Sequence, residues 1–220
     1  MTQTQNVVEL MGIYGSDETH ALSAWTSTSR DLDDDKRSRM DGLLQFLADN
    51  EHHTPFEKSS IHFLVTTDIA SHVHILKHRI GVSVNAESAR YKELKDDKYY
   101  VPVDWDDDEV AEYVTHVKSA FRQYHKAIKR LERKGLSRKR AKESARFYMP
   151  YGSQITSDVM FNFRSFYHFL KLRYSVHAQL EIREIAKKML QLVIDSGSFS
   201  KTLFAFGLVD ATGNVCQPFE

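Results

Sequence analysis

The longest helical stretch of the sequence, at about residues 109–134, sets the strongest limit on the fold. It contains no proline or glycine, and an acidic run at residues 104–108 precedes it, where negative charge complements a helix N-terminus. Gly135 then ends the pattern, as glycine does just after many helices. Only four prolines and nine glycines interrupt the 220 residues, so we expect helices to dominate the chain.

Hydrophobic periodicity predicts the other elements. Ile61, Phe63 and Val65 recur at every second position, the period of a strand with one buried face. The expected architecture is α+β: a single domain, residues 1–220, of long helices packed against a small, mostly antiparallel sheet. Residues 1–35 and 196–220 are expected to be peripheral. The predicted helices cover about residues 36–50, 69–76, 109–134, 137–147, 166–174 and 176–193, and the predicted strands about 61–66 and 159–163.

The chain has no net charge that would attract it to nucleic acid or a membrane surface, because thirty Lys and Arg balance thirty Asp and Glu. An anion site must therefore be a local cluster. The single cysteine, Cys216, excludes an intrachain disulfide framework and suits a reducing compartment. The N-terminus has no signal-peptide pattern, and no run of about 18 apolar residues occurs. We expect a cytoplasmic protein with no membrane and no nucleic-acid partner.

The segment EHHTPFEK, residues 51–58, gathers ligand-type side chains around a proline turn before the first predicted strand. It contains His52, His53 and Glu57. Such loops often bind ligands, although a solvated turn at Pro55 explains the composition equally well. Metal binding is the weaker hypothesis, since the histidine spacings match no established zinc pattern and HExxH is absent.

The segment KHRIGVSVNAESARY, residues 77–91, places cations at the end of a predicted helix, followed by hydroxyl and amide donors. Guanidinium and backbone groups bind phosphate oxygens through charge-assisted hydrogen bonds, so the segment predicts a site for phosphate or another anionic ligand. The alternative is a basic helix C-terminus followed by a polar loop, with no ligand.

A third group of polar residues lies among aromatic residues that we expect in the core. Arg164 and His168 would be neighbours on one helix, at the i,i+4 spacing. A helix with Arg and His among buried aromatics usually lines a cavity or an interface, and subunit contact is the alternative to a ligand site. The group comprises Arg146, Asn162, Arg164, His168, Arg173, His177 and Gln179.

Residues 126–146 hold ten Lys or Arg against two Glu. They could form a nucleic-acid-binding face, but few aromatic residues are interspersed and the nearby acidic run offsets the charge. A solvated helix face is the favoured interpretation.

The three clusters, in this order, resemble the flavin-dependent thymidylate synthase family over about residues 36–195. That family's signature is Arg-His-Arg, seven residues and then Ser, commonly continued as Ser-Ala-Arg-Tyr. Here residues 77–79 are Lys-His-Arg, and residues 88–91 are Ser-Ala-Arg-Tyr after a gap of eight residues. HHTPFE resembles the family's His-x-Thr-Pro-Phe-Glu element. Residues 162–182 resemble its segment with Asn-x-Arg-Ser, Leu-x-Leu-Arg and His-Ala-Gln-x-Glu-Ile.

The resemblance implies reductive methylation of dUMP to dTMP, with methylenetetrahydrofolate as carbon donor, NADPH as reductant and FAD as cofactor. It also implies a homotetramer whose active sites combine several subunits. A cofactor-borne hydride fits the sequence, because Cys216 has no basic partner nearby that would make it a nucleophile. By matching position, FAD contacts are expected from His52, Thr54, Glu57, His78, Arg79, Asn162 and His168, and dUMP contacts from His74, Lys77, Ser88, Arg90, Arg146 and Arg173.

Arg173 and Ser88 are the expected catalytic residues, Arg173 as a fixed cation that stabilises charge on the pyrimidine. Three positions depart from the family pattern: Lys77 replaces Arg, His74 stands where Gln is common, and His168 stands where Asn is common. Lysine keeps the positive charge of arginine but cannot form the paired hydrogen bonds of a guanidinium group. The variant signature leaves open a related flavin-dependent one-carbon transfer to a pyrimidine nucleotide, such as hydroxymethylation. A basic helical nucleic-acid-binding module is a more distant alternative.

Overall fold

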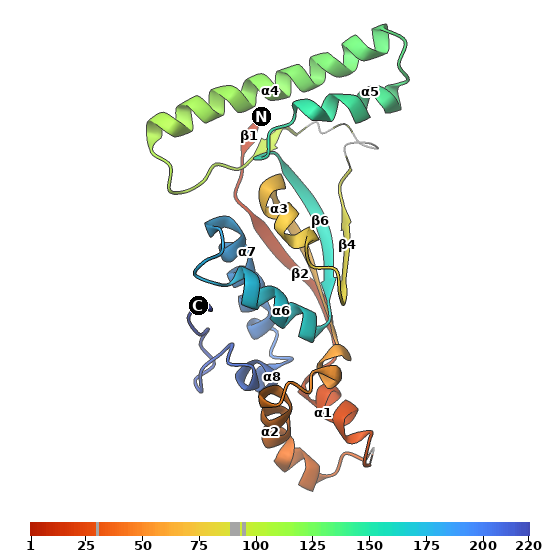
Figure 1. Cartoon of the computed structure of the whole chain (residues 1–220), viewed down its shortest axis with the longest axis vertical. Helices are drawn as coiled ribbons and strands as arrows, with labels where there is room; N and C mark the ends of the chain where they lie inside the picture. Colours follow the sequence, from red (N-terminus) through yellow and green to blue (C-terminus); the bar gives the residue numbers. More distant parts are fainter. Residues whose placement is uncertain (30, 89–92, 94–95) are drawn as a thin grey trace. The chain divides into compact units, whose positions relative to one another are not determined.

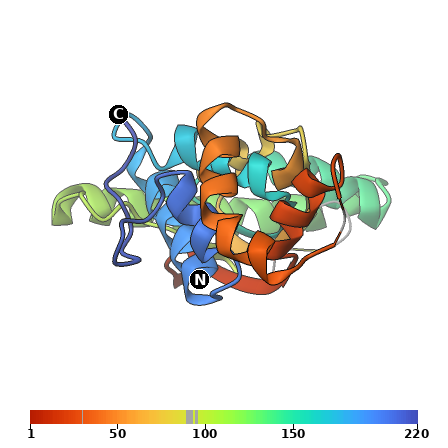
Figure 2. The same cartoon turned by 90° about the horizontal axis from the view of Figure 1, so that it is seen from below.

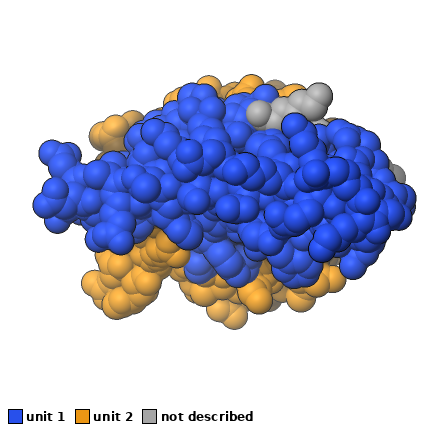
Figure 3. All heavy atoms as spheres, turned by 90° about the horizontal axis from the view of Figure 1, so that it is seen from above, with its two compact units in different colours: residues 1–7, 65–75, 85–157 blue, residues 8–64, 76–84, 158–220 orange. Residues whose placement is uncertain are grey.

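The computed structural model of the chain describes residues 1–29, 31–88, 93 and 96–220. Its contacts divide it into two units, coloured separately in Figure 3. Several strands begin in one unit and end in the other, so neither unit is a continuous piece of sequence. The single-domain assignment stays a prediction. Unit 1 comprises Met1–Val7, Val65–Ile75 and Asn85–Ser157, and unit 2 comprises Val8–Leu64, Leu76–Val84 and Asp158–Glu220.

The elements follow one another along the chain as labelled in Figure 1. The helices of the described residues are α1 (Asp17–Trp25), α2 (Asp34–Asp49), α3 (Ile69–Leu76), α4 (Asp107–Arg133), α5 (Arg138–Ala145), α6 (Phe163–Arg173), α7 (Leu180–Asp195) and α8 (Ser200–Ala205), with 3-10 turns η1 (Thr54–Glu57) and η2 (Arg146–Tyr148). The strands are β1 (Thr2–Gln3), β2 (Val7–Tyr14), β3 (Ser60–Asp68), β4 (Val82–Ala86), β5 (Lys98–Tyr99) and β6 (Gln154–Phe161).

The main sheet has four strands in the order β2-β3-β6-β4, and β1 pairs with β5 in a separate parallel ribbon. In β3 the side chains of Ile61, Phe63 and Val65 are fully buried, while the residues between them are half-buried. That alternation is the one predicted from the sequence. Helices combined with a small antiparallel sheet confirm the α+β class.

The long helix α4 begins and ends where its sequence signals predict. The side chain of Asp106 caps it by accepting a hydrogen bond from Glu109 N at 2.9 Å, and two further aspartates occupy the first turn. Beyond its last turn, Gly135 adopts a φ of +95°, which glycine reaches without steric cost. Within unit 1, the buried Tyr124 and Ile128 of α4 pack with alanines of α5.

Helix α7 begins at Leu180, so the predicted start near residue 176 is wrong. The backbone N–H groups before it are used elsewhere. Val176 N donates to Phe219 O at 2.8 Å, and His177 N donates to the hydroxyl of Ser175 at 3.2 Å. These bonds hold a turn in place of a first helical turn.

The terminal segments contribute more to unit 2 than their expected peripheral role suggests. Helices α1, α2 and α8 lie side by side (Figure 2). Ala21 and Phe199 are fully buried. Near the C-terminus, Cys216 N donates to Leu208 O at 3.0 Å, and the Tyr174 hydroxyl donates to Cys216 O at 3.2 Å. The C-terminal segment is therefore bonded to the residue that follows α6.

A buried chain of hydrogen bonds joins α1 to α8 and to the start of β3. The Thr202 hydroxyl donates to Asp17 Oδ1 at 2.6 Å, so its oxygen accepts from His20 Nδ1 at 3.1 Å. His20 Nε2 then accepts from the Ser59 hydroxyl at 2.9 Å. The imidazole is fully buried and stacks on Phe199 at 5.1 Å. This arrangement requires a neutral His20, and burial lowers its pKa from 6.5 to about 4.

Candidate active site

The loop that follows α3 is clamped to the N-terminus of α6, within unit 2. Asn162 caps the helix, since its Oδ1 accepts from Ser165 N at 2.8 Å. Asn162 N also donates to Gly81 O at 3.1 Å, and the Ser165 hydroxyl donates to Ile80 O at 2.7 Å. The loop that carries Lys77, His78 and Arg79 therefore has a fixed position on α6.

Glycine is the only residue type that the hydrogen bonds between this loop and α6 allow at position 81. Its φ is +64°, in the left-handed region. A Cβ atom there would lie 2.3 Å from Ser165 Oγ and 2.5 Å from Asn162 Nδ2. Both side chains already hold the loop or the helix end, so neither can move away without breaking a hydrogen bond.

We expect Gly81→Ala to lower the free energy of unfolding by about 1 kcal/mol more than Gly197→Ala, because it also breaks one of the clamping hydrogen bonds. Gly197 is a matched control, with a φ of +68° and no heavy atom within 4 Å of an added Cβ. Urea denaturation of both variants measures the difference. Equal losses would mean that Ser165 and Asn162 tolerate the methyl group and that the clamp is loose.

A pocket of about 230 Å³ opens beside this loop. Three cations and two imidazoles line it, and the described residues add no carboxylate to the lining. Such a lining favours an anionic ligand, and three aliphatic side chains are available to pack against a ring. The lining residues are Lys77, His78, Arg79, Ile80, Val82, Ser165, His168, Leu172 and Arg173.

His78 and Arg173 contact each other inside this pocket. Arg173 Nε donates to His78 Nε2 at 3.1 Å, so that ring nitrogen is an acceptor. His78 is buried and rests against the edge of Phe169, with ring centroids 5.0 Å apart. Burial lowers the pKa of Arg173 from its ordinary value, yet arginine stays charged in proteins. His78 thus fixes one edge of a cation whose terminal nitrogens can reach a ligand.

The EHHTPFEK segment is anchored by Phe56, which is fully buried and meets Phe206 edge to face at 4.7 Å. The turn is therefore packed, while His52 and Thr54 stay exposed. Glu57 forms an ion pair with Arg164, which joins η1 to α6. Burial first, and then Arg164, lowers the pKa of the neighbouring His53.

The predicted site residues thus fall into separate groups. The pocket brings together Lys77, His78, Arg79, His168 and Arg173. Asn162 is an N-cap beside the pocket, and His52, Thr54 and Glu57 belong to the η1 region of unit 2. In unit 1, His74 is on α3, Ser88 follows β4 and Arg146 is in η2. Arg90 lies outside the described residues.

Sequence reasoning missed the role of Ser165. The available signal was Asn followed three residues later by Ser at the junction of a strand and a helix, which is typical of an N-cap. Which loop the serine hydroxyl would hold could not be derived from that pattern.

A larger cavity of about 650 Å³ lies elsewhere in unit 2, next to α2, α8 and residues 209–213. Its lining lysine, Lys201, is ion-paired with Asp41. The cavity has no cluster of cations comparable to that of the smaller pocket, so we place the candidate site at the smaller one.

Among the described residues, no group of three or more His, Cys, Asp or Glu side chains could hold a metal ion. No helix in the same part of the chain is long and apolar enough to cross a membrane.

Comparison with known proteins identifies the family of the chain. The family model described as thymidylate synthase complementing protein matches residues 7–196. The chain is 31% identical over 196 residues to a flavin-dependent thymidylate synthase of Thermosipho melanesiensis, covering 84% of each chain. It is 29% identical over 195 residues to that of Kosmotoga olearia, covering 81% of each.

A solved structure is also similar: the UMP/dUMP methylase PolB from Streptomyces cacaoi, bound with 5-Br dUMP. Its TM-score is 0.77 at 27% identity, and the match covers 94% of this chain and 97% of PolB. The same protein bound with 5-Br UMP matches with a TM-score of 0.75. With a family model that spans most of its length and relatives that are enzymes, the chain belongs to the thymidylate synthase complementing protein family and is an enzyme.

Proposed function

We propose that this enzyme is a flavin-dependent thymidylate synthase that converts dUMP to dTMP, with FAD as cofactor, methylenetetrahydrofolate as carbon donor and NADPH as reductant. The observation that carries the proposal is the pocket lined by Lys77, Arg79 and Arg173 with no described carboxylate. A nucleotide monophosphate and a flavin diphosphate are both anions that such a lining attracts. The names of the relatives support the flavin and the pyrimidine nucleotide.

The residues of the pocket suit a flavin in charge and in apolar surface. His168 and Arg79 offer exposed donors, and Ile80 and Leu172 offer apolar surface for a ring. When bound, a reduced flavin supplies the hydride, which the side chains of this chain cannot supply. The contribution of the protein is then to orient the pyrimidine and to hold its charge.

Arg173 has the central role in that task. Because His78 holds its Nε, the guanidinium keeps a fixed orientation with its terminal nitrogens available to a pyrimidine carbonyl. A preoriented cation stabilises negative charge that develops on the ring when carbon or hydride is added. Lys77, Ser88, Arg90 and Arg146 are proposed to hold the nucleotide, and His74 to lie beside it. Lys77 supplies a positive charge but lacks the planar guanidinium of arginine. Its hydrogen bonds to a phosphate are therefore less directional than those of arginine.

We also propose a homotetramer with active sites shared between subunits, as the family resemblance implies. Analytical ultracentrifugation at micromolar concentration measures this directly, and a monomer that turns over substrate would rule it out. A cytoplasmic location stays a prediction.

The experiment for the function has two steps. The absorption spectrum of the purified protein should contain the bands of oxidised flavin. The protein is then incubated with dUMP, methylenetetrahydrofolate, NADPH and FAD, and the nucleotide is identified by mass spectrometry. A mass of dTMP is the expected result, and a hydroxymethylated nucleotide would support the related one-carbon transfer instead.

The analogue bound in one PolB structure favours a second candidate, methylation of UMP. A parallel incubation with UMP tests it. Turnover of UMP at a rate equal to that of dUMP would make the protein a methylase of both nucleotides. A colourless protein that is inactive with both and binds DNA in a salt-dependent way would favour the nucleic-acid-binding alternative.

A further inference from the structure

The long helix α4 carries a row of exposed cations along one side. At about 3.6 residues per turn, their side chains fall within an arc of about 80°, roughly opposite the buried residues of the helix. The row extends over about 22 Å of the helix axis, with neighbouring cations about 5–6 Å apart along it. It is called the basic stripe below and consists of Lys118, Arg122, Lys126, Lys129 and Arg133.

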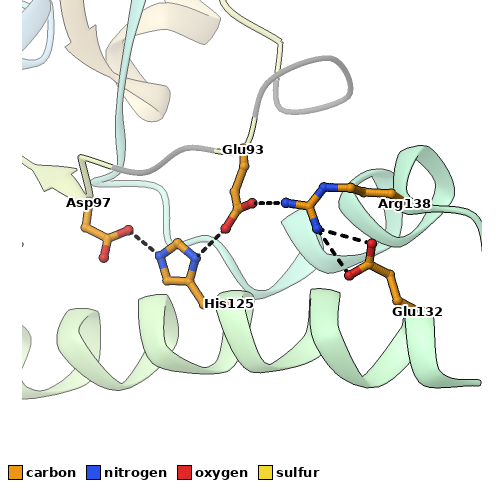
Figure 4. A network of polar contacts seen from close by, with 5 residues as sticks. All are labelled: Glu93, Asp97, His125, Glu132 and Arg138. Carbon is orange, nitrogen blue, oxygen red and sulfur yellow. Dashed lines mark hydrogen bonds and ion pairs between the residues drawn. The ribbon is translucent and has the colours of Figure 1, made fainter.

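The charge of the basic stripe is not neutralised within the part of the chain that the structure describes. None of its five cations forms an ion pair there. The carboxylates beside α4 contact other groups (Figure 4). His125 Nδ1 lies 3.2 Å from Glu93 Oε1, and its Nε2 lies 2.8 Å from Asp97 Oδ1. Arg138 contacts Glu93 at 2.8 Å and Glu132 at 3.2 Å.

The stability of the helix does not explain the basic stripe. Its members are three or four residues apart, a spacing at which like charges on a helix repel and disfavour it. Cations favour a helix near its C-terminus, but that effect falls off within the last turn, and Arg133 is the one member located there. Lys118, Arg122 and Lys126 therefore carry charge that the helix does not need, which indicates a binding surface.

Exposed aromatic rings flank the basic stripe. The turn η2 packs against α4, where Arg130 Nη2 donates to the Tyr148 hydroxyl at 3.3 Å. Phe147 is 86% exposed and Tyr148 is 45% exposed. Few aromatic residues lie among the cations in the sequence, because the fold brings these two to α4 from a later turn. The surface thus combines cations with rings that are available for stacking.

This combination fits a single-stranded nucleic acid better than other polyanions. Surfaces that bind single strands hold the phosphates with a row of cations and stack the bases on aromatic side chains. A duplex keeps its bases inside and would leave the rings without a role. A membrane-bound helix inserts apolar residues next to its cations, whereas Ser119 and Gln123 beside the stripe are polar.

We propose that the basic stripe, with Phe147 and Tyr148, is a binding surface for single-stranded nucleic acid of any sequence. Cations that contact phosphates carry no sequence information, and an aromatic ring stacks on every base. All of these residues belong to unit 1, and the proposal does not depend on the methylation of a nucleotide. The expectation of no nucleic-acid partner rested on the net charge of the chain, which does not show how the charges are distributed.

The main test is fluorescence anisotropy with a labelled single strand of about 20 nucleotides. The logarithm of the association constant should fall against the logarithm of the salt concentration with a slope of about −3.5, for five phosphate contacts. Replacement of Lys118 and Lys126 together by Gln should raise Kd about 20-fold at about 0.1 M salt and reduce the slope by about 1.4. The matched control replaces the exposed Lys139 and Lys187 by Gln, which changes the net charge equally and should change Kd less than about twofold.

A second variant tests the rings. Phe147→Ala should raise Kd at least about fivefold without changing the salt slope, because stacking releases no counterions. Phe147→Trp keeps a ring and should retain the original Kd. A duplex of the same sequence should bind more weakly and should not respond to Phe147→Ala.

Several results would overturn the proposal. These are equal losses in the stripe variant and its control, equal affinity for single strand and duplex, and binding to vesicles of phosphatidylserine and phosphatidylcholine without binding to the strand. A changed oligomeric state of the stripe variant in ultracentrifugation would make the stripe a subunit contact instead. The incubation with dUMP is read separately. A protein that binds the strand as expected but forms no dTMP would retain this surface and lose the proposed function, and the reverse result would remove the surface alone.

Discussion

Replacement of Arg173 by alanine is expected to lower kcat by about 10²- to 10³-fold, the effect of removing one preoriented group that stabilises charge in a transition state. Flavin content after purification should change far less, because Lys77, His78 and Arg79 remain in the pocket. The measurements are the rate of dTMP formation at saturating substrate and the flavin absorbance per protein chain.

Two further variants sharpen this result. Arg173→Lys keeps the charge but loses the planar fork and the Nε that donates to His78, so we expect an intermediate rate. Arg122→Ala removes an exposed arginine of α4 and should leave the rate unchanged. Equal losses of flavin and turnover in Arg173→Ala would mean that Arg173 serves the cofactor and not the pyrimidine.

Acidification from pH 8 to pH 5 is expected to remove about 2 kcal/mol of the free energy of unfolding through His20 alone. His20 is neutral in the folded protein, where burial lowers its pKa to about 4 from the ordinary histidine value of 6.5. Between pH 6.5 and pH 4, His20 therefore binds a proton in the unfolded chain but stays neutral in the folded protein. The contribution is complete above that pH, declines as the pH falls toward 4, and then levels off.

The variant that isolates this effect is His20→Gln. A glutamine amide can still donate toward Thr202 and accept from Ser59, but it does not titrate. The variant should be less stable at pH 8 and should lose about 2 kcal/mol less than the unmodified protein between pH 8 and pH 5, as measured by urea denaturation. His116→Gln, at an exposed position, should keep the full pH dependence. If His20→Gln kept it as well, the acid sensitivity would arise elsewhere.

The elements that the sequence predicted well are those with strong local signals. Helix α4 has an acidic start and a glycine stop, and β3 alternates strictly because one of its faces is buried. Strand β2 escaped prediction because it is at the edge of the sheet and carries no fully buried residue from Val7 to Tyr14, so its alternation is weak. Helix α8, from Ser200 to Ala205, is too short for a helical period to emerge.

The same limit applies to the site. The motif resemblance named Lys77, His78, Arg79, His168 and Arg173, and these residues line one pocket. The bond between His78 and Arg173 could not be predicted, because it joins residues 95 positions apart that only the fold brings together. The positions of a motif indicate which residues matter, whereas their mutual contacts depend on the packing of α6 against the loop.

The attachment of the C-terminal segment to α6 has a practical consequence. Cys216 is the single thiol of the chain, it is partly exposed, and its carbonyl accepts a hydrogen bond from Tyr174, the neighbour of Arg173. A maleimide dye or a nitroxide spin label would therefore attach at one position without any cysteine replacement. Such a probe would sit on the segment bonded to the end of α6 and could follow ligand binding in real time.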